Sequence, residues 1–181
     1  MTDSARPARW SAPTALLHWL GAATVIGLLG LGFAMTRFFG SAARFDLYQL
    51  HKSFGVVALA LFVLRLAARA ASRPPAPLDG RAWERRAASA THIGLYALMA
   101  LAILAGWIAA SSSPLPIPTL VFGLFTWPDI APRGEALFAA ASAAHAWLAY
   151  GLAALVALHA GAALKHWLWD RDGVMGRMRV G

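Results

Sequence analysis

The stretch HAWLAYGLAALVALH, residues 145–159, holds two histidines fourteen residues apart within one long apolar segment. An α-helix rises 1.5 Å and turns 100° per residue, so His145 and His159 are separated by about 21 Å and nearly four full turns. Their rings therefore point the same way from opposite halves of one membrane-crossing helix. Histidine is rare at such depth and is usually functional there. The spacing predicts two stacked metal centres that share this helix as a ligand arm.

The composition of the chain is that of a membrane protein. Of its 181 residues, 59% are apolar and only 13% are charged, against about 25% charged in a soluble domain. A helix needs about 20 apolar residues to cross the hydrocarbon layer. Four stretches reach that length, at about 13–36, 47–70, 87–110 and 138–168. We predict an all-α, integral membrane four-helix bundle that forms a single domain over residues 1–181.

The net charge of +8 reflects the membrane rather than a nucleic acid partner. Two Lys or Arg residues lie in the N-terminal segment, six lie from Arg65 to Arg86, and four lie from Lys165 onward. The two remaining connections hold only Arg37, Arg44, Lys52 and Arg133. By the positive-inside rule, both termini and the middle connection are predicted to be cytoplasmic. Anionic lipid headgroups explain most of the basicity, and no nucleic acid partner is expected.

The connections between the spans are expected to be non-helical. Three prolines and a glycine make the segment Ser72–Gly80 an extended cytoplasmic linker. Five further prolines predict an irregular outer connection over 111–135. Within the spans, glycines either let helices approach closely or leave room for a flat, bulky ligand. Gly151 lies between the two histidines of the last span, where such a ligand needs space.

The six histidines sort by depth once the spans are oriented. The outer half of the bundle is predicted to hold His51 and His145, and the inner half the other four: His18, His92, His159 and His166. A lone histidine would ordinarily bond a carbonyl of a neighbouring helix. Two same-depth pairs that share one helix favour metal ligation instead. Depth pairs His51 with His145, but it leaves both His18 and His92 as possible partners of His159.

The ligand types available favour haem b over other metal groups. All eight Asp and Glu residues lie at span edges or in connections, which argues against di-iron, calcium and magnesium sites. The chain has no cysteine, which excludes iron–sulfur clusters and covalent C-x-x-C-H haem. Paired imidazoles fit two haem b groups, whose irons each need two axial ligands. The haem propionates need cations, which four basic residues could supply: Arg44, Lys52, Arg65 and Arg69.

Four segments resemble the bacterial cytochrome b561 family, which is related to the cytochrome b subunits of nickel–iron hydrogenases and formate dehydrogenases. They are LLHWL (16–20), QLHKSFGV (49–56), FGLFTWPDI (122–130) and AAHAWLAYGLAALVALHAGAALKHWLW (143–169). The resemblance implies a multi-pass protein of the bacterial inner membrane with two b haems. It assigns His18 and His159 to the inner haem and His51 and His145 to the outer haem. In one class of the family, the superoxide oxidases, the histidines that match His92 and His166 would lie beside a ubiquinone site.

Bis-histidine ligation fills both axial positions, so such an iron transfers single electrons and no side chain is expected to act as a chemical catalyst. Electrons would enter and leave by small molecules or docked proteins. The first hypothesis is a superoxide oxidase-like oxidoreductase that links a periplasmic one-electron donor, superoxide, to ubiquinone and requires no partner protein. The second is a haem-b anchor subunit for a periplasmic dehydrogenase or hydrogenase, and the third is a non-redox transporter or scaffold. The short outer connection has few charges to dock a large partner, which favours the first.

Overall fold

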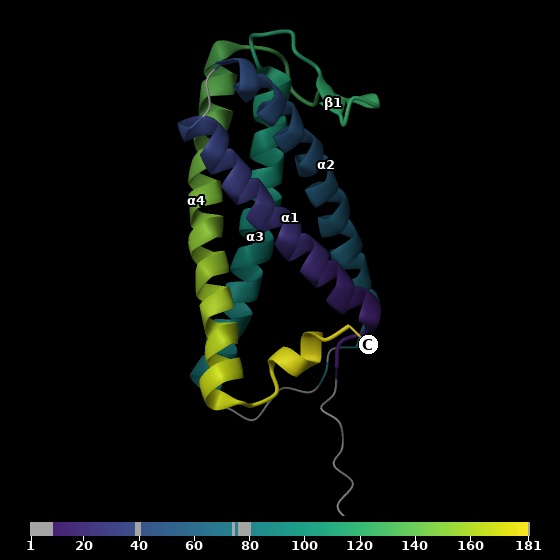
Figure 1. Cartoon of the computed structure of the whole chain (residues 1–181), viewed down its shortest axis with the longest axis vertical. Coiled ribbons are helices and arrows are strands. Elements are labelled where there is room, and N and C mark those ends of the chain that lie inside the picture. The colour runs from purple at the N-terminus through teal and green to yellow at the C-terminus, as the bar shows by residue number, and fades with distance from the viewer. Residues whose placement is uncertain (1–8, 39–40, 74, 76–80, 181) are drawn as a thin grey trace, which may run out of the picture.

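A computed structural model describes residues 9–38, 41–73, 75 and 81–180 of the chain (Figure 1). Its main elements are four long helices: α1 (Ala12–Arg37), α2 (Ser41–Ala71), α3 (Ala82–Ser112) and α4 (Glu135–Lys165). Each of these helices is long and apolar enough to cross a membrane. The predicted all-α membrane bundle of four helices is confirmed.

α1, α2 and α3 extend past the predicted spans at both ends, because polar residues continue each helix beyond its apolar segment. α4 begins three residues before its predicted span and ends three residues before the end of that span, at Lys165, where a π-helix follows. α1 begins after Ser11, with a proline in its first turn, where no helical hydrogen bond is lost. α3 begins five residues before the expected span, and the Glu84 carboxylate accepts the backbone N–H of Arg81 at 3.0 Å. This contact satisfies one of the free donors at the helix start. α3 ends before Pro114, as the proline pattern predicts.

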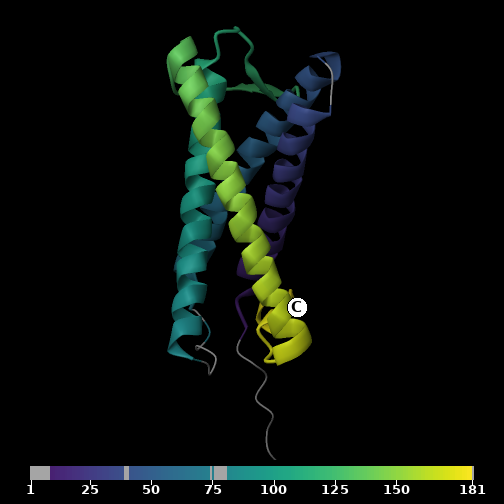
Figure 2. The ribbon, with the colours of Figure 1, turned by 90° about the vertical axis from the view of Figure 1, so that its left-hand side faces the viewer.

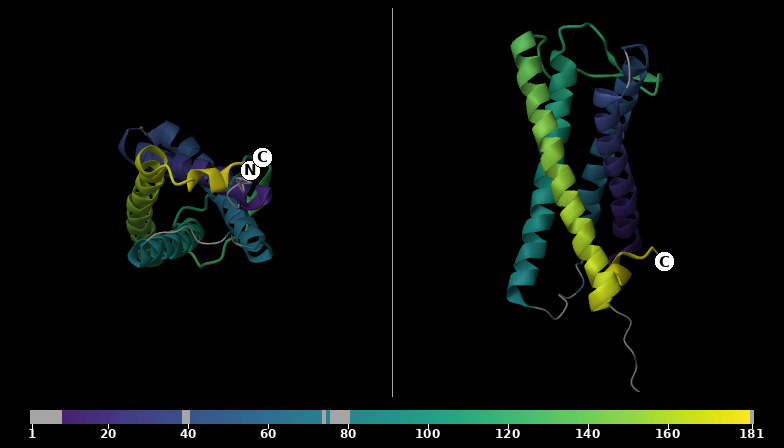
Figure 3. Two further views of the ribbon diagram at one scale, coloured as in Figure 1. Left: turned by 90° about the horizontal axis from the view of Figure 1, so that it is seen from below. Right: turned by 60° about the vertical axis from the view of Figure 1, so that its left-hand side comes forward.

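Consecutive helices pack as two helical hairpins. α1 lies along α2, and α3 lies along α4, whereas contacts between the two hairpins are sparse among the described residues. α4 leans across α3 so that its two ends are at different distances from the other hairpin (Figure 2). Seen from below, the four helices surround a common centre (Figure 3). Side chains from both hairpins can therefore meet along the axis of the bundle.

The interior of the bundle is lined by small side chains. Most of the buried apolar residues in the described part of the chain are alanines: Ala15, Ala58, Ala102, Ala109 and Ala141. The largest side chains that are fully buried there are only serines: Ser53, Ser111 and Ser112. Protein interiors are ordinarily filled to crystal-like density by interlocking side chains. An interior of this kind leaves room for a large apolar group between the hairpins.

The connection between α3 and α4 contains a β-hairpin, so the prediction of an irregular segment over 111–135 was wrong there. Strand β1 (Thr119–Val121) pairs antiparallel with β2 (Phe125–Trp127). Pro118 and Pro128 flank the strands and therefore remove no donor from the ladder. Phe122 and Gly123 both have positive φ, 49° and 74°, and Leu124 N–H donates to Val121 O at 2.9 Å. Two positive φ values define the turn type that matches the twist of a hairpin.

The C-terminal segment crosses beneath the bundle from the end of α4 to the start of α1 (Figure 3). It contains a π-helix, η1 (His166–Asp170), and a 3-10 helix, η2 (Met175–Met178). The Trp19 indole N–H donates to Met178 O at 2.8 Å, and Trp10 N–H donates to Arg177 O at 3.1 Å. These bonds join α1 and the residues just before it to the C-terminal segment at one end of the bundle. Most of the predicted linker Ser72–Gly80 lies outside the described residues.

Candidate metal centres

His51 of α2 and His145 of α4, called the outer pair here, face each other in the half of the bundle next to the β-hairpin. Their ring centroids are 6.0 Å apart and their planes are at 89°. Two metal–imidazole bonds of about 2 Å, plus about 1 Å from each nitrogen to its ring centre, would separate two axial imidazoles by about 6 Å. The outer pair therefore has the spacing of two ligands on opposite sides of one metal ion.

The His145 ring is held in one tautomer by α3. Its Nδ1 lies 2.8 Å from the carbonyl oxygen of Ala102. Because a carbonyl can only accept, Nδ1 carries the proton and Nε2 keeps its lone pair for a metal. A ring N–H bonded to a backbone carbonyl is the usual outer contact of a metal-binding histidine. For His51, Nδ1 is buried and has no hydrogen-bond partner among the described residues.

His18 of α1 and His159 of α4, called the inner pair, lie in the other half of the bundle. Their ring centroids are 6.3 Å apart and their planes are at 81°. His92 of α3 also contacts His159, with centroids 5.2 Å apart, which is shorter than the spacing expected for two axial ligands. His92 is exposed, whereas His18 and His159 are partly buried. The geometry therefore favours His18 as the partner of His159 and places His92 at the edge of the site.

A cavity lined by all four helices surrounds the inner pair. Its walls are largely apolar and include Gly21, Ala22 and Ala58. Arg65 also lines the cavity, and its Nε is buried with no hydrogen-bond partner in the described part of the chain. Apolar walls, two facing imidazoles and a cation without a partner at Nε are the features that a flat apolar macrocycle with carboxylate groups requires. The residues at the inner site therefore fit haem b.

The other three basic residues singled out in the sequence do not line this cavity. The guanidinium of Arg69 lies over the Trp10 ring at 5.1 Å. Lys52 Nζ donates to Pro118 O at 3.3 Å, toward the outer connection, and Arg44 is exposed near the start of α2. Of the four, only Arg65 lines the cavity that contains the inner pair.

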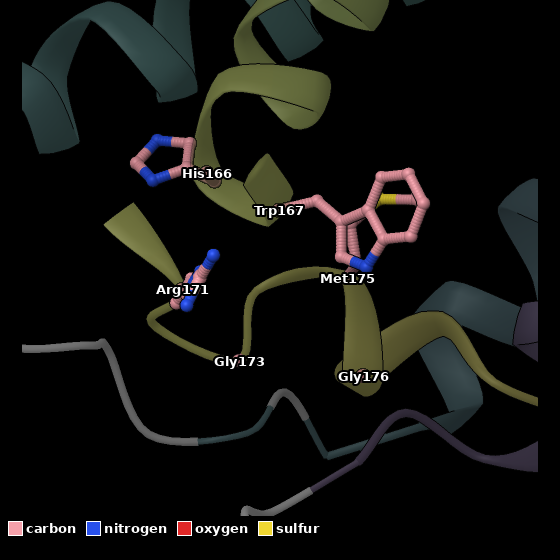
Figure 4. A pocket seen from close by; sticks show the side chains of 6 residues that line it. All are labelled: His166, Trp167, Arg171, Gly173, Met175 and Gly176. Carbon is pink, nitrogen blue, oxygen red and sulfur yellow. The ribbon is translucent and has the colours of Figure 1, made fainter. Parts of the chain in front are cut away.

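His166 lies in a different pocket from His92. It begins η1 and lines a recess with Trp167, Arg171 and Met175 (Figure 4). Its Nδ1–H donates to the Asp172 carboxylate at 2.6 Å, and Asp170 lies 3.1 Å from the same nitrogen. The two carboxylates hold the ring at the rim of the bundle. The expected grouping of His166 with His92 at one site is not seen in the described residues.

Two glycines that the sequence did not single out lie against the outer pair. A Cβ on Gly106 would be 2.9 Å from His145 Nδ1, and a Cβ on Gly32 would be 3.3 Å from His51 Cε1. Gly151, which the sequence favoured, has only Leu98 methyl groups at 3.8 Å. The sequence did hold one signal that could have identified these two glycines, namely their depth in the membrane. Gly32 and Gly106 each lie in their own span at the level of the outer pair.

The β-hairpin is fastened to the turn of α2 that carries His51. The Ser53 hydroxyl is within reach of Leu120 O at 3.1 Å and accepts Phe122 N–H at 3.0 Å. Gln49 Nε2 donates to Pro118 O at 3.0 Å, and the rings of Phe54 and Phe122 are in contact at 5.3 Å. The hairpin therefore forms a folded cap beside the outer pair.

A membrane four-helix bundle in which paired histidines face one another across an interior of small residues is the arrangement of a membrane cytochrome b. Residues 9–181 match the family model described as prokaryotic cytochrome b561, and the chain belongs to that family. It is 33% identical over 180 residues to cytochrome b561 homolog 2 of Escherichia coli (strain K12), an alignment that spans 98% of this chain and 95% of that protein. The resemblance predicted from the four motifs is confirmed.

Family membership has direct consequences for this protein. The chain is a multi-pass protein of the bacterial inner membrane, and the family binds haem b and transfers electrons across the membrane. These properties favour a redox role over the alternative of a transporter or scaffold.

Proposed function

We propose that this protein carries electrons through two b haems from superoxide on the periplasmic side to ubiquinone. The observation that supports two sites is the pair of histidine contacts, 6.0 Å and 6.3 Å between ring centroids, in opposite halves of α4. Haem b, when bound, supplies at each site an iron that gains and loses a single electron. His51 and His145 would hold the outer group, and His18 and His159 the inner one.

The protein contributes fixed positions for the two sites. His145 and His159 lie on one continuous helix, about 21 Å apart along its axis. Because two histidines would hold each group, no position would be left on its iron for oxygen or substrate. Such a site would supply electron transfer alone.

The proposed reaction consumes two superoxide ions for each quinone. Each superoxide ion gives up one electron and leaves as O₂, and ubiquinone takes up two electrons and two protons to form ubiquinol. We assign the inner cavity to the cytoplasmic side, with both termini, because most of the basic residues flank that end of the spans. The protons then come from the cytoplasm.

The protons need a route through side chains that can bind and release them. His92 is exposed at the edge of the inner cavity, 5.2 Å from His159. Imidazole exchanges protons readily near neutral pH. We assign His92 to the quinone oxygen as hydrogen-bond and proton donor. His166, held by Asp172 at the rim, is assigned to proton uptake from the cytoplasm.

The cations are assigned by their position. Arg65 would bind a propionate of the inner group, because it lines that cavity with a buried Nε, and Arg69 lies one helical turn further along α2. Lys52 and Arg44 belong to the outer end of α2 and would serve the outer propionates.

The folded cap favours a small donor over a docked protein. Its hairpin is bonded back onto α2 through Ser53 and Gln49 rather than extended as a docking arm. A small diffusing anion needs no such arm.

The test uses the purified haem-loaded protein with xanthine and xanthine oxidase as the superoxide source. We expect the reduced α-band to appear, and ubiquinone-1 to be reduced when added, with both effects abolished by superoxide dismutase. Reduction that persists with superoxide dismutase would overturn the assignment of superoxide as the donor. A preparation without a haem spectrum would overturn the proposed function itself.

A further inference from the structure

The Ala102 carbonyl has two hydrogen-bond donors within reach. In an α-helix, the carbonyl of residue 102 accepts the N–H of residue 106. It also accepts His145 Nδ1–H at 2.8 Å. A carbonyl oxygen has two lone pairs, so both bonds can form together. The second bond requires that His145, which comes from another helix, reach the side of α3.

Glycine at position 106 opens the side of α3 to this ring. Ala102 and Gly106 are four residues apart and lie one above the other on the same helix face. A Cβ on Gly106 would be 2.9 Å from both Nδ1 and Cε1 of His145, closer than real Cβ contacts. The blocked atom is the same Nδ1 that donates to Ala102. Any side chain at position 106 would therefore displace the ring or break this bond.

The ring of His51, the other member of the outer pair, also lies close to a glycine. A Cβ on Gly32 of α1 would be 3.3 Å from His51 Cε1, which is tighter than an ordinary contact. The helical glycines near the inner pair differ, since Gly21 and Gly161 have no neighbouring described atom within 4 Å of a Cβ. Gly94, two residues from His92, meets Leu155 Cδ2 at 2.9 Å rather than a histidine. Among the described glycines, contacts with a histidine ring are thus found only at the outer pair.

We infer that Gly106 is a positioning residue that tunes His145 as an axial ligand, and that Gly32 leaves room for the His51 ring in its position beside it. This inference rests on the proposed haem at the outer pair. A histidine whose free N–H bonds a carbonyl is a more basic ligand, and a more basic ligand stabilises the oxidised iron. The bond to the Ala102 carbonyl would therefore lower the reduction potential of the outer haem. Gly106 makes that carbonyl available.

The test compares three variants of the full-length haem-loaded protein: Gly106→Ala, Gly30→Ala and Gly27→Ala. The two controls add the same methyl group to a helix, because a Cβ on Gly30 or on Gly27 meets no described atom within 4 Å. Redox titration and low-spin electron paramagnetic resonance report each haem separately. The His145→Ala variant identifies which signal belongs to the outer haem.

We expect Gly106→Ala to raise the potential of the outer haem and move its resonance signal, with the inner haem and both controls unchanged. A wild-type potential and signal in Gly106→Ala would overturn the inference. If Gly106→Ala does not accumulate as folded protein, Gly32→Ala is decisive, because its contact needs only a small shift. It should move the outer signal alone, and an unchanged outer signal would overturn the inference. A wild-type protein without an outer haem would instead contradict the proposed function.

Discussion

Arg65 of α2 and Tyr96 of α3 are in direct contact, with the guanidinium carbon 5.4 Å from the centre of the tyrosine ring. The contact joins the two helical hairpins, and both residues line the cavity that contains the inner pair. The ring stabilises the cation through its face and leaves the guanidinium donors available to an anion. A buried donor without a partner costs free energy, so this position is prepared for a carboxylate.

Replacing Arg65 should therefore change the inner haem selectively. Arg65→Gln removes a positive charge that opposes the oxidised iron, so the inner potential should fall, by an amount equivalent to roughly 1 kcal/mol at an effective dielectric constant of about 20. Redox titration followed at the α-band measures the shift. Arg37→Gln is the matched control, because Arg37 lies over Phe33 at the other end of α1. A fall of equal size in both variants would count against a local role for Arg65.

The two sites should be lost independently when their ligands on α4 are replaced. The wild-type chain should contain two haems in a pyridine haemochrome assay, and His145→Ala and His159→Ala should each contain one. The sites are about 21 Å apart, a distance at which substitutions rarely couple. Circular dichroism controls for folding. If either substitution removed both haems from a folded protein, the picture of two separate sites would fail.

His92 and His18 should behave differently although both contact His159. His92→Ala should keep both haems and slow ubiquinone reduction by about 10²-fold, the usual contribution of a proton donor. His18→Ala should lose the inner haem. Haem content and the rate of ubiquinone-1 reduction are measured on the same preparations. Loss of haem in the His92 variant, with retention in the His18 variant, would reverse the two roles.

Ser53 should stabilise the outer cap. Ser53 is 1% exposed, and its hydroxyl oxygen accepts Phe122 N–H at 3.0 Å. Its single proton has two acceptors within reach, Gln49 O at 2.8 Å and Leu120 O at 3.1 Å. Ser53→Ala removes the bond to Phe122 and should cost about 0.5–1.5 kcal/mol, so the thermal midpoint should fall accordingly. Thr24→Val is the control, because the Thr24 hydroxyl donates only within its own helix, to Leu20 O at 2.8 Å. Equal midpoints for the two variants would show that the cap contributes little.

The sequence predicted the helices and the family because both depend on local patterns. Apolar length defined four spans, and the prolines after Ser113 ended α3 where expected. The β-hairpin was missed because its strands are three residues long, and their pairing depends on a turn with two positive φ values. Its attachment to Ser53 and Gln49 depends on residues about 70 positions away. Local sequence carries no direct record of such contacts.

The sequence by itself determined the depth of each histidine, because position along a helix converts to height at a constant rise per residue. Depth alone could not choose between His18 and His92, and it grouped His166 with His92. Only the tertiary structure showed His18 at 6.3 Å and His92 at 5.2 Å from His159, and His166 in a separate pocket. It also showed that Gly32 and Gly106 contact the outer pair, whereas Gly151 does not. The height of a residue in the membrane is one coordinate of its side chain. The other two depend on the rotation of each helix about its own axis and on its tilt, and both arise from packing between helices.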